Sequence, residues 1–147
     1  MKKILMLLLI AASLLCGCSA NSEKENISEY YGELSKAQEI AIIPVNTSTA
    51  TQALTESEEL SDFIFALDMD HWELKKLPET YELIGTFQFS QEETIKFGES
   101  ATTGELHPVC EILCYEDIPY LTLKMVNLEM TFEVPDTTIE YLTDYFR

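Results

Sequence analysis

Three side chains that could bind a metal or act in catalysis lie close together in the sequence: His107, Cys110 and Cys114. Thiolate and imidazole groups bind zinc, and a thiolate next to an imidazole can act as a nucleophile. A metal or redox protein that uses these three residues is therefore one hypothesis. However, their spacing matches no zinc-finger or zinc-ribbon pattern, no second cluster completes four ligands, and no glycine-rich oxyanion turn accompanies them.

Burial is the alternative interpretation of the two cysteines. The segment 109–115 is apolar except for Glu111, which predicts a central strand. Residues four apart on a strand share a face but lie about 13 Å apart. A disulfide needs Cα atoms within about 7 Å, so Cys110 and Cys114 cannot bond to each other on a strand. We expect both thiols to face the core, with their pKa raised by burial.

The second histidine, His71, follows Asp68 and Asp70 at the end of a predicted helix. The two carboxylates could hold a cation, but the twelve-residue calcium-loop pattern is absent. A helix-ending turn, with Trp72 as a core anchor, is the simpler interpretation. The sequence also lacks the nucleophile-elbow, zinc-protease and phosphate-loop motifs. We therefore predict no catalytic residue, no metal site and no cofactor, and expect the protein not to be an enzyme.

The composition is strongly acidic. The 147 residues include 9 Lys and Arg against 26 Asp and Glu, which gives a net charge of −17. So few cations cannot neutralise a row of phosphates, and this argues against nucleic-acid binding. The acidity favours a basic protein or peptide as partner, through long-range attraction.

Apolar residues at helical spacing predict two amphipathic helices, over about 55–68 and 137–147. The stripe of the first helix comprises Leu60, Phe63, Ile64 and Leu67. Capping-box patterns mark both N-termini, in the pairs Thr55–Glu58 and Thr137–Glu140.

Alternating apolar residues predict strands over 37–45, 71–77, 81–90, 93–97, 109–115, 120–125 and 128–134. We expect 81–90 to form a hairpin with 93–97, and 120–125 to form one with 128–134. The segments 46–53 and 99–107 are predicted loops. The fold class that follows is α+β, an antiparallel sheet of about five to seven strands with both helices packed on one face.

The last predicted hairpin gives a specific expectation about its two faces. Phe132 and Thr131 are neighbours on one strand and therefore point to opposite sides of the sheet. We expect Phe132 to be buried and Thr131 to be exposed to solvent.

The N-terminal segment has the pattern of a secretory signal. Lys2 and Lys3 precede an apolar run over 4–15, which is too short to span a bilayer but suits a signal peptide. The run ends in Leu15-Cys16-Gly17-Cys18. This tetrapeptide resembles the lipobox of bacterial lipoproteins, in which an aliphatic residue, a permissive residue and a small residue precede an invariant cysteine.

The resemblance implies that Cys18 carries a diacylglyceryl group and that cleavage occurs between Gly17 and Cys18. The chain would then be anchored by lipid to the cell membrane, on its extracytoplasmic face. The corresponding organisation is a signal peptide over 1–17, an acidic tether over 18–35 and one domain over 36–147. An ordinary secretory signal, with its cysteines there by chance, is the alternative.

This layout is similar to that of small lipoproteins of Gram-positive bacteria, a likeness that transfers no site. The leading hypothesis for function is a non-enzymatic, membrane-anchored binding or accessory module. The alternatives are the metal or redox protein above and an inhibitor or immunity-type protein. The inhibitor would block a basic toxin or wall hydrolase, with the acidic loop Glu99–Glu105 as its tool.

Overall fold

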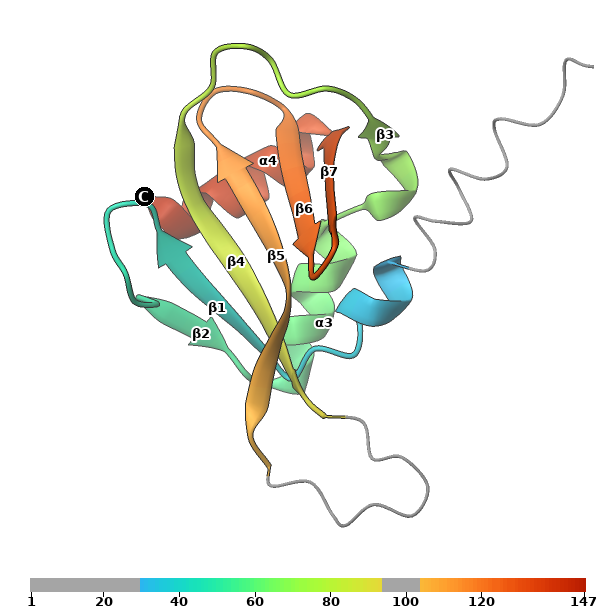
Figure 1. Cartoon of the computed structure of the whole chain (residues 1–147), viewed down its shortest axis with the longest axis vertical. Helices are drawn as coiled ribbons and strands as arrows, with labels where there is room; N and C mark the ends of the chain where they lie inside the picture. Colours follow the sequence, from blue (N-terminus) through green and yellow to red (C-terminus); the bar gives the residue numbers. More distant parts are fainter. Residues whose placement is uncertain (1–29, 94–103) are drawn as a thin grey trace, which may run out of the picture.

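The alternating segments pair into one antiparallel sheet in the computed structural model, which describes residues 30–93 and 104–147. Within these residues the sheet has seven strands in the order β2-β1-β4-β5-β6-β7-β3 (Figure 1). The strands are β1 (Glu39–Pro44), β2 (Gln52–Leu54), β3 (Glu73–Leu74), β4 (Leu83–Glu92), β5 (Leu106–Tyr115), β6 (Tyr120–Met125) and β7 (Leu128–Glu133).

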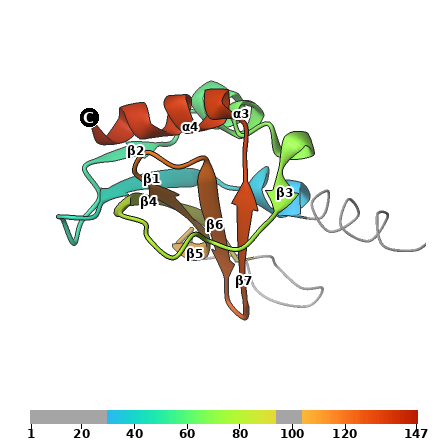
Figure 2. The ribbon, with the colours of Figure 1, turned by 90° about the horizontal axis from the view of Figure 1, so that it is seen from above.

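Two helices, α3 (Ser57–Ala66) and α4 (Asp136–Thr143), cover one face of this sheet (Figure 2). A 3-10 turn, η2 (Met69–His71), follows α3, and another, η3 (Asp144–Phe146), follows α4. The predicted α+β class, with two helices on one face of an antiparallel sheet, is confirmed. In the part of the chain that the structure describes, no helix has the length and apolar character needed to cross a membrane.

Some predictions concern residues outside the described ranges. They are the signal peptide over 1–17, the lipidation of Cys18, most of the tether over 18–35 and most of the acidic loop Glu99–Glu105.

The core lies between the sheet and the helices. Phe63 of α3 is fully buried, and its ring lies 4.9 Å from that of Phe87 and 6.0 Å from that of Phe89, both on β4. Tyr141 and Tyr145, from α4 and η3, contact the same Phe63 ring. The apolar stripe of α3 therefore packs on the centre of the sheet, as its helical spacing indicated.

The strand predicted over 93–97 lies almost entirely outside the described residues, but β4 does not pair as the predicted hairpin of 81–90 with 93–97 requires. β4 is bonded to β1 on one edge and to β5 on the other, so that Phe87 pairs with both Ile42 and Ile112. A strand has only two edges, and both edges of β4 are occupied. The other predicted hairpin, β6 with β7, is confirmed.

Two short strands form the edges of the sheet, and neither was predicted with its true extent. β2 begins at Gln52, within the segment 46–53 that was predicted to be a loop, and ends at Leu54, one residue after that segment. β3 retains only two residues of the predicted strand 71–77, and the first residue of that segment, His71, belongs to η2.

Both capping-box predictions are wrong. α3 has Glu56 as its N-cap and α4 has Pro135, and neither residue makes a side-chain capping bond. Thr55 lies outside α3, whereas Thr137 lies inside α4, because the helix already begins at Asp136. A capping box needs its Thr at the N-cap position itself, and Thr55 lies one residue before the N-cap of α3 whereas Thr137 lies two residues after that of α4.

The packed part of the chain begins upstream of Lys36. Residues 30–34 form a helical turn, and Leu34, which the sequence assigned to the tether, is buried in the core. Tyr30 packs against the same core.

The sheet face opposite the helices is partly covered. The connection from β3 to β4 passes on this side (Figure 2), and Tyr81 in it stacks edge-on against Tyr115, with ring centroids 5.2 Å apart. The Tyr115 hydroxyl donates to Thr122 at 2.7 Å, and Thr122 bonds to Thr131 at 2.8 Å. Thr131 is therefore half-buried and the expectation of an exposed Thr131 is wrong, whereas the expected burial of Phe132 is confirmed.

Candidate functional site

Strand β5 carries both of the cysteines that could do chemistry, and it places them in the core. Cys110 and Cys114 are free thiols, and both are buried, as expected. Burial, with a contribution from the Glu111 carboxylate, raises the pKa of Cys110 to about 12. Burial also raises the pKa of Cys114. Both thiols are thus protonated at neutral pH, whereas nucleophilic attack and metal binding need the thiolate.

The third residue of this segment, His107, lies on β5 opposite Gln91 and is partly exposed. Over residues 30–93 and 104–147, no three His, Cys, Asp or Glu side chains come together in a way that could hold a metal ion. The metal or redox hypothesis therefore gains no support from the arrangement around Cys110 and Cys114.

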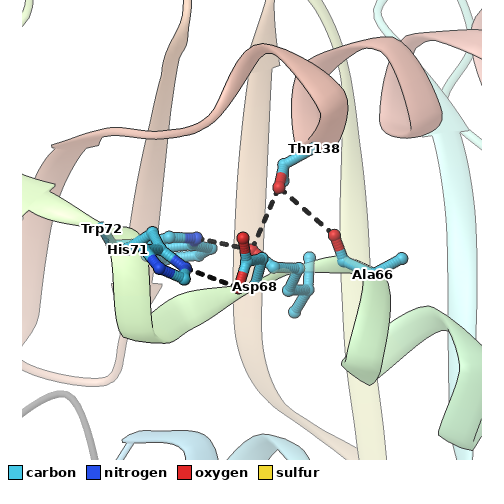
Figure 3. Close-up of polar contacts among 6 residues, drawn as sticks. Ala66, Asp68, His71, Trp72 and Thr138 are labelled. Atoms are coloured by element: carbon cyan, nitrogen blue, oxygen red, sulfur yellow. Dashed lines mark hydrogen bonds and ion pairs between the residues drawn. The ribbon is translucent and has the colours of Figure 1, made fainter.

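The second histidine lies in a turn that closes helix α3 (Figure 3). His71 Nδ1 is 2.8 Å from Asp68 Oδ1, and both side chains are well exposed to solvent. Asp68 itself adopts the left-handed conformation with φ of 49°. The carboxylate thus pairs with the histidine, and the interpretation as a helix-ending turn is confirmed.

The same turn joins the two helices. The indole Nε1 of Trp72 donates to the Leu67 carbonyl at 2.7 Å, and Trp72 is buried. The hydroxyl of Thr138 on α4 lies 3.2 Å from the Ala66 carbonyl and 3.3 Å from that of Leu67, and its one proton is shared between them (Figure 3). These bonds satisfy carbonyls at the end of α3 that have no partner within the helix. The arrangement is structural.

A cleft between the start of β4, the β5–β6 turn and the C-terminal residues has the features of a ligand site. Its volume is about 480 Å³, within the range usual for small-ligand pockets. Four separate segments line it: the end of β1, the start of β4, the turn between β5 and β6, and the C-terminal stretch from α4 to Arg147. Backbone bonds hold these segments together, because Val45 N–H donates to Ile84 O at 2.9 Å and Glu116 N–H donates to Glu82 O at 2.8 Å.

Part of the cleft lining is apolar. Ile84, Ile139 and Phe146 are partly buried and pack against the core, so that each presents its remaining surface to the cleft. Val45, beside them, is 50% exposed. This surface could accept an apolar group of a ligand.

The rest of the lining is dominated by carboxylates. Glu82, Glu116, Asp117 and Glu140 reach the cleft from three different segments. The one cation in the lining, Arg147, forms an ion pair with Asp144 at 2.6 Å. Among the described residues, none of these four carboxylates forms a salt bridge, so their charge is available to a ligand.

A second, smaller cavity of about 210 Å³ lies between the 30–37 segment and α3. Its lining combines Tyr31 and apolar residues with the hydroxyls of Ser35, Ser57 and Ser61, and it contains no charged side chain. It is below the volume usual for ligand pockets and lacks a charge that would orient a ligand.

Sequence reasoning missed the larger cleft. Its carboxylates are separated by more than thirty positions along the chain between Glu82 and Glu116, so no local motif marks them. The available signals were the turn Glu116-Asp117 and the net charge of −17, which identify acidity without its location.

Comparisons with known proteins add a resemblance in structure. One solved structure to which the chain is similar is a thioesterase-like protein from Clostridium sporogenes. The match covers 77% of this chain and 96% of that chain, with a TM-score of 0.43 and 12% sequence identity. A likeness this distant carries no argument about function. No protein-family model matches the chain, and no curated protein matches it.

Proposed function

We propose that the protein is a lipid-anchored, non-enzymatic binding module on the extracytoplasmic face of the cell membrane, and that its ligand is basic. Support for the anchor comes from the sequence Leu15-Cys16-Gly17-Cys18 after a charged start and an apolar run of signal-peptide length. Two acyl chains on one cysteine give a firmer hold than a single chain.

The observation that carries the binding part of the proposal is the cleft with unpaired carboxylates. Its lining contains Glu82, Glu116, Asp117 and Glu140, together with one arginine that is already paired. The net charge of −17 adds a long-range attraction for cations and opposes the approach of anionic lipid headgroups. A soluble basic ligand therefore suits this surface better than the membrane does.

The position of the cleft in the molecule also supports this proposal. The helical turn over 30–34, where the described chain starts, and the C-terminus lie on opposite sides of the molecule in both views (Figures 1 and 2). The cleft includes the C-terminal residues Phe146 and Arg147. A tether that joins the domain at residue 30 would therefore join it on the side opposite the cleft, which supports a cleft that is open to a ligand.

Anchoring is tested with two cysteine variants that differ in one position of the lipobox. Cys18→Ala removes the acceptor thiol and should abolish both acylation and cleavage, whereas Cys16→Ala should leave them intact. The readouts are incorporation of labelled palmitate and partition into detergent. Partition of Cys18→Ala as a lipoprotein would refute the proposed anchor.

Binding is tested with the full-length chain in a neutral detergent. An oligolysine peptide should bind, an oligoglutamate peptide of equal length should not, and high salt should weaken the binding because the attraction is electrostatic. Equal affinity for the two peptides would refute the proposed preference for a basic ligand.

A further inference from the structure

We infer that the cleft between β4, the β5–β6 turn and α4 binds a peptide segment in which Lys or Arg alternates with large apolar residues. This inference rests on the proposed function, and it adds the chemical class and the location of the ligand. It depends on two kinds of surface that meet in one cleft of about 480 Å³.

The carboxylates define the cationic part of the ligand. Glu116 and Asp117 are consecutive in the β5–β6 turn, and the backbone bond from Glu116 to Glu82 fixes the β4 segment beside them. Glu140 of α4 adds a fourth carboxylate to the lining. Because these groups lie on different segments, their charge is distributed along the cleft, and more than one cation on a single ligand can be paired.

The apolar lining defines the rest of the ligand. Ile84, Ile139 and Phe146 reach the cleft while they pack against the core, so they are held in place without a ligand. A metal ion would leave this surface unused, and a free polyamine would contact it only through the short methylene chains between its ammonium groups. A peptide with an aliphatic or aromatic side chain next to a basic one uses both surfaces, and burial of its apolar group contributes to affinity.

The chain offers a conservative way to remove charge from the cleft. Asp117 adopts the left-handed conformation with φ of 54°, which Asn tolerates well. The double variant Glu116→Gln, Asp117→Asn therefore removes two charges while it preserves the turn. The matched control is Glu58→Gln, Glu59→Gln, which changes the net charge equally at exposed positions of α3 outside the cleft.

The experiment titrates full-length protein, in neutral detergent, with three end-blocked peptides by calorimetry. Gly-Lys-Leu-Lys-Phe-Gly carries both features, Gly-Lys-Ser-Lys-Ser-Gly carries positive charge without large apolar groups, and Gly-Glu-Leu-Glu-Phe-Gly carries the same apolar groups with the opposite charge. We expect the first peptide to bind most tightly and the third to bind least. The cleft variant should bind the first peptide about fivefold or more weakly, and the control variant should lose less than about twofold.

The outcomes separate this inference from the proposed function. Equal losses in the cleft and control variants would mean that the peptide senses only the net charge, which overturns the assignment to the cleft but leaves a basic ligand. Equal affinity for the first two peptides would overturn the role of the apolar lining. If no lysine-containing peptide binds, the proposed function fails as well. Circular dichroism of both variants confirms that each is folded.

Discussion

The ring of Phe146 lies directly against the backbone of Gly85. A Cβ atom at Gly85 would overlap three carbons of this ring, although Gly85 does not have the positive φ that would itself require glycine. Gly85 lies where the register of β4 and β5 shifts, opposite Cys114. The glycine is needed because it lets the C-terminal turn η3 approach the sheet, and this approach forms one wall of the cleft.

Gly85→Ala should therefore lower the free energy of unfolding by about 1–3 kcal/mol, as overpacking does in other cores. Gly32→Ala is the matched control, because nothing lies within 4 Å of a Cβ built at Gly32, and its effect should be small. Urea unfolding of both variants measures the difference. In a Phe146→Ala background, Gly85→Ala should cost clearly less, and an unchanged cost there would contradict the contact.

Truncation of Phe132 should be severe and truncation of Thr131 moderate. Phe132 is buried, and its ring lies 5.2 Å from that of Trp72, so Phe132→Ala should cost about 3–5 kcal/mol. Thr131→Ala removes one of the two hydrogen-bond partners of the buried Thr122 hydroxyl and should cost about 1 kcal/mol. Exposed Thr137 serves as the control for a Thr→Ala change. Equal urea midpoints for Thr131→Ala and Thr137→Ala would show that the hydroxyl pair is not stabilising.

Thr138 should matter more than other threonines of α4. Its hydroxyl is buried and donates to the end of α3, so Thr138→Val keeps the shape but removes those bonds, at an expected cost of about 1–3 kcal/mol. Thr143→Val is the comparison, because the Thr143 hydroxyl bonds only within its own helix, at an exposed site. Thermal unfolding of both variants should show a lower midpoint for Thr138→Val, and identical midpoints would refute the predicted connection between the helices.

The buried thiols should resist labelling until the domain unfolds. Neither Cys110 nor Cys114 should react appreciably with an aromatic disulfide reagent in native buffer, and both should react in urea, because burial keeps them protonated and inaccessible. Rapid native-state labelling of either thiol, or stoichiometric metal in the purified protein, would restore the chemical role that their spacing first raised.

The raised pKa of Cys110 should make the folded state less stable at alkaline pH. The pKa of Cys110 is raised from 9.0 to about 12 on folding, so the folded state retains a proton that the unfolded state has lost. The contribution of the protonated Cys110 thiol to the free energy of unfolding is complete below about pH 9. It is lost as pH rises towards 12, by at most about 1.4 kcal/mol per pH unit. Cys110→Ala should therefore lose less stability than the parent chain between about pH 8 and pH 10. If the urea midpoints of Cys110→Ala and of the parent chain fall equally over this pH range, the prediction is contradicted.

Local sequence patterns predicted those helices and strands in which buried residues recur at the period of the element. The spacing of Phe63 and Ile64 marks α3, and the alternation along β6 and β7 marks their hairpin, because each element has one face on the core. The burial of Thr122 was not predictable in this way, because Tyr81, forty-one positions upstream, contributes to the cover of that face through Tyr115. The cleft has the same origin in contacts between distant segments.

The edges of the sheet are short: β2 has three residues and β3 has two. A strand at the edge of a sheet has unpaired amide and carbonyl groups, and a strand of a neighbouring molecule can pair with them to form a shared sheet. A protein attached to a surface meets its own copies at high local density, where such joining would be favoured. The short strands β2 and β3 themselves offer little backbone for a copy to pair with, which would limit such joining if the chain is anchored to a membrane as proposed.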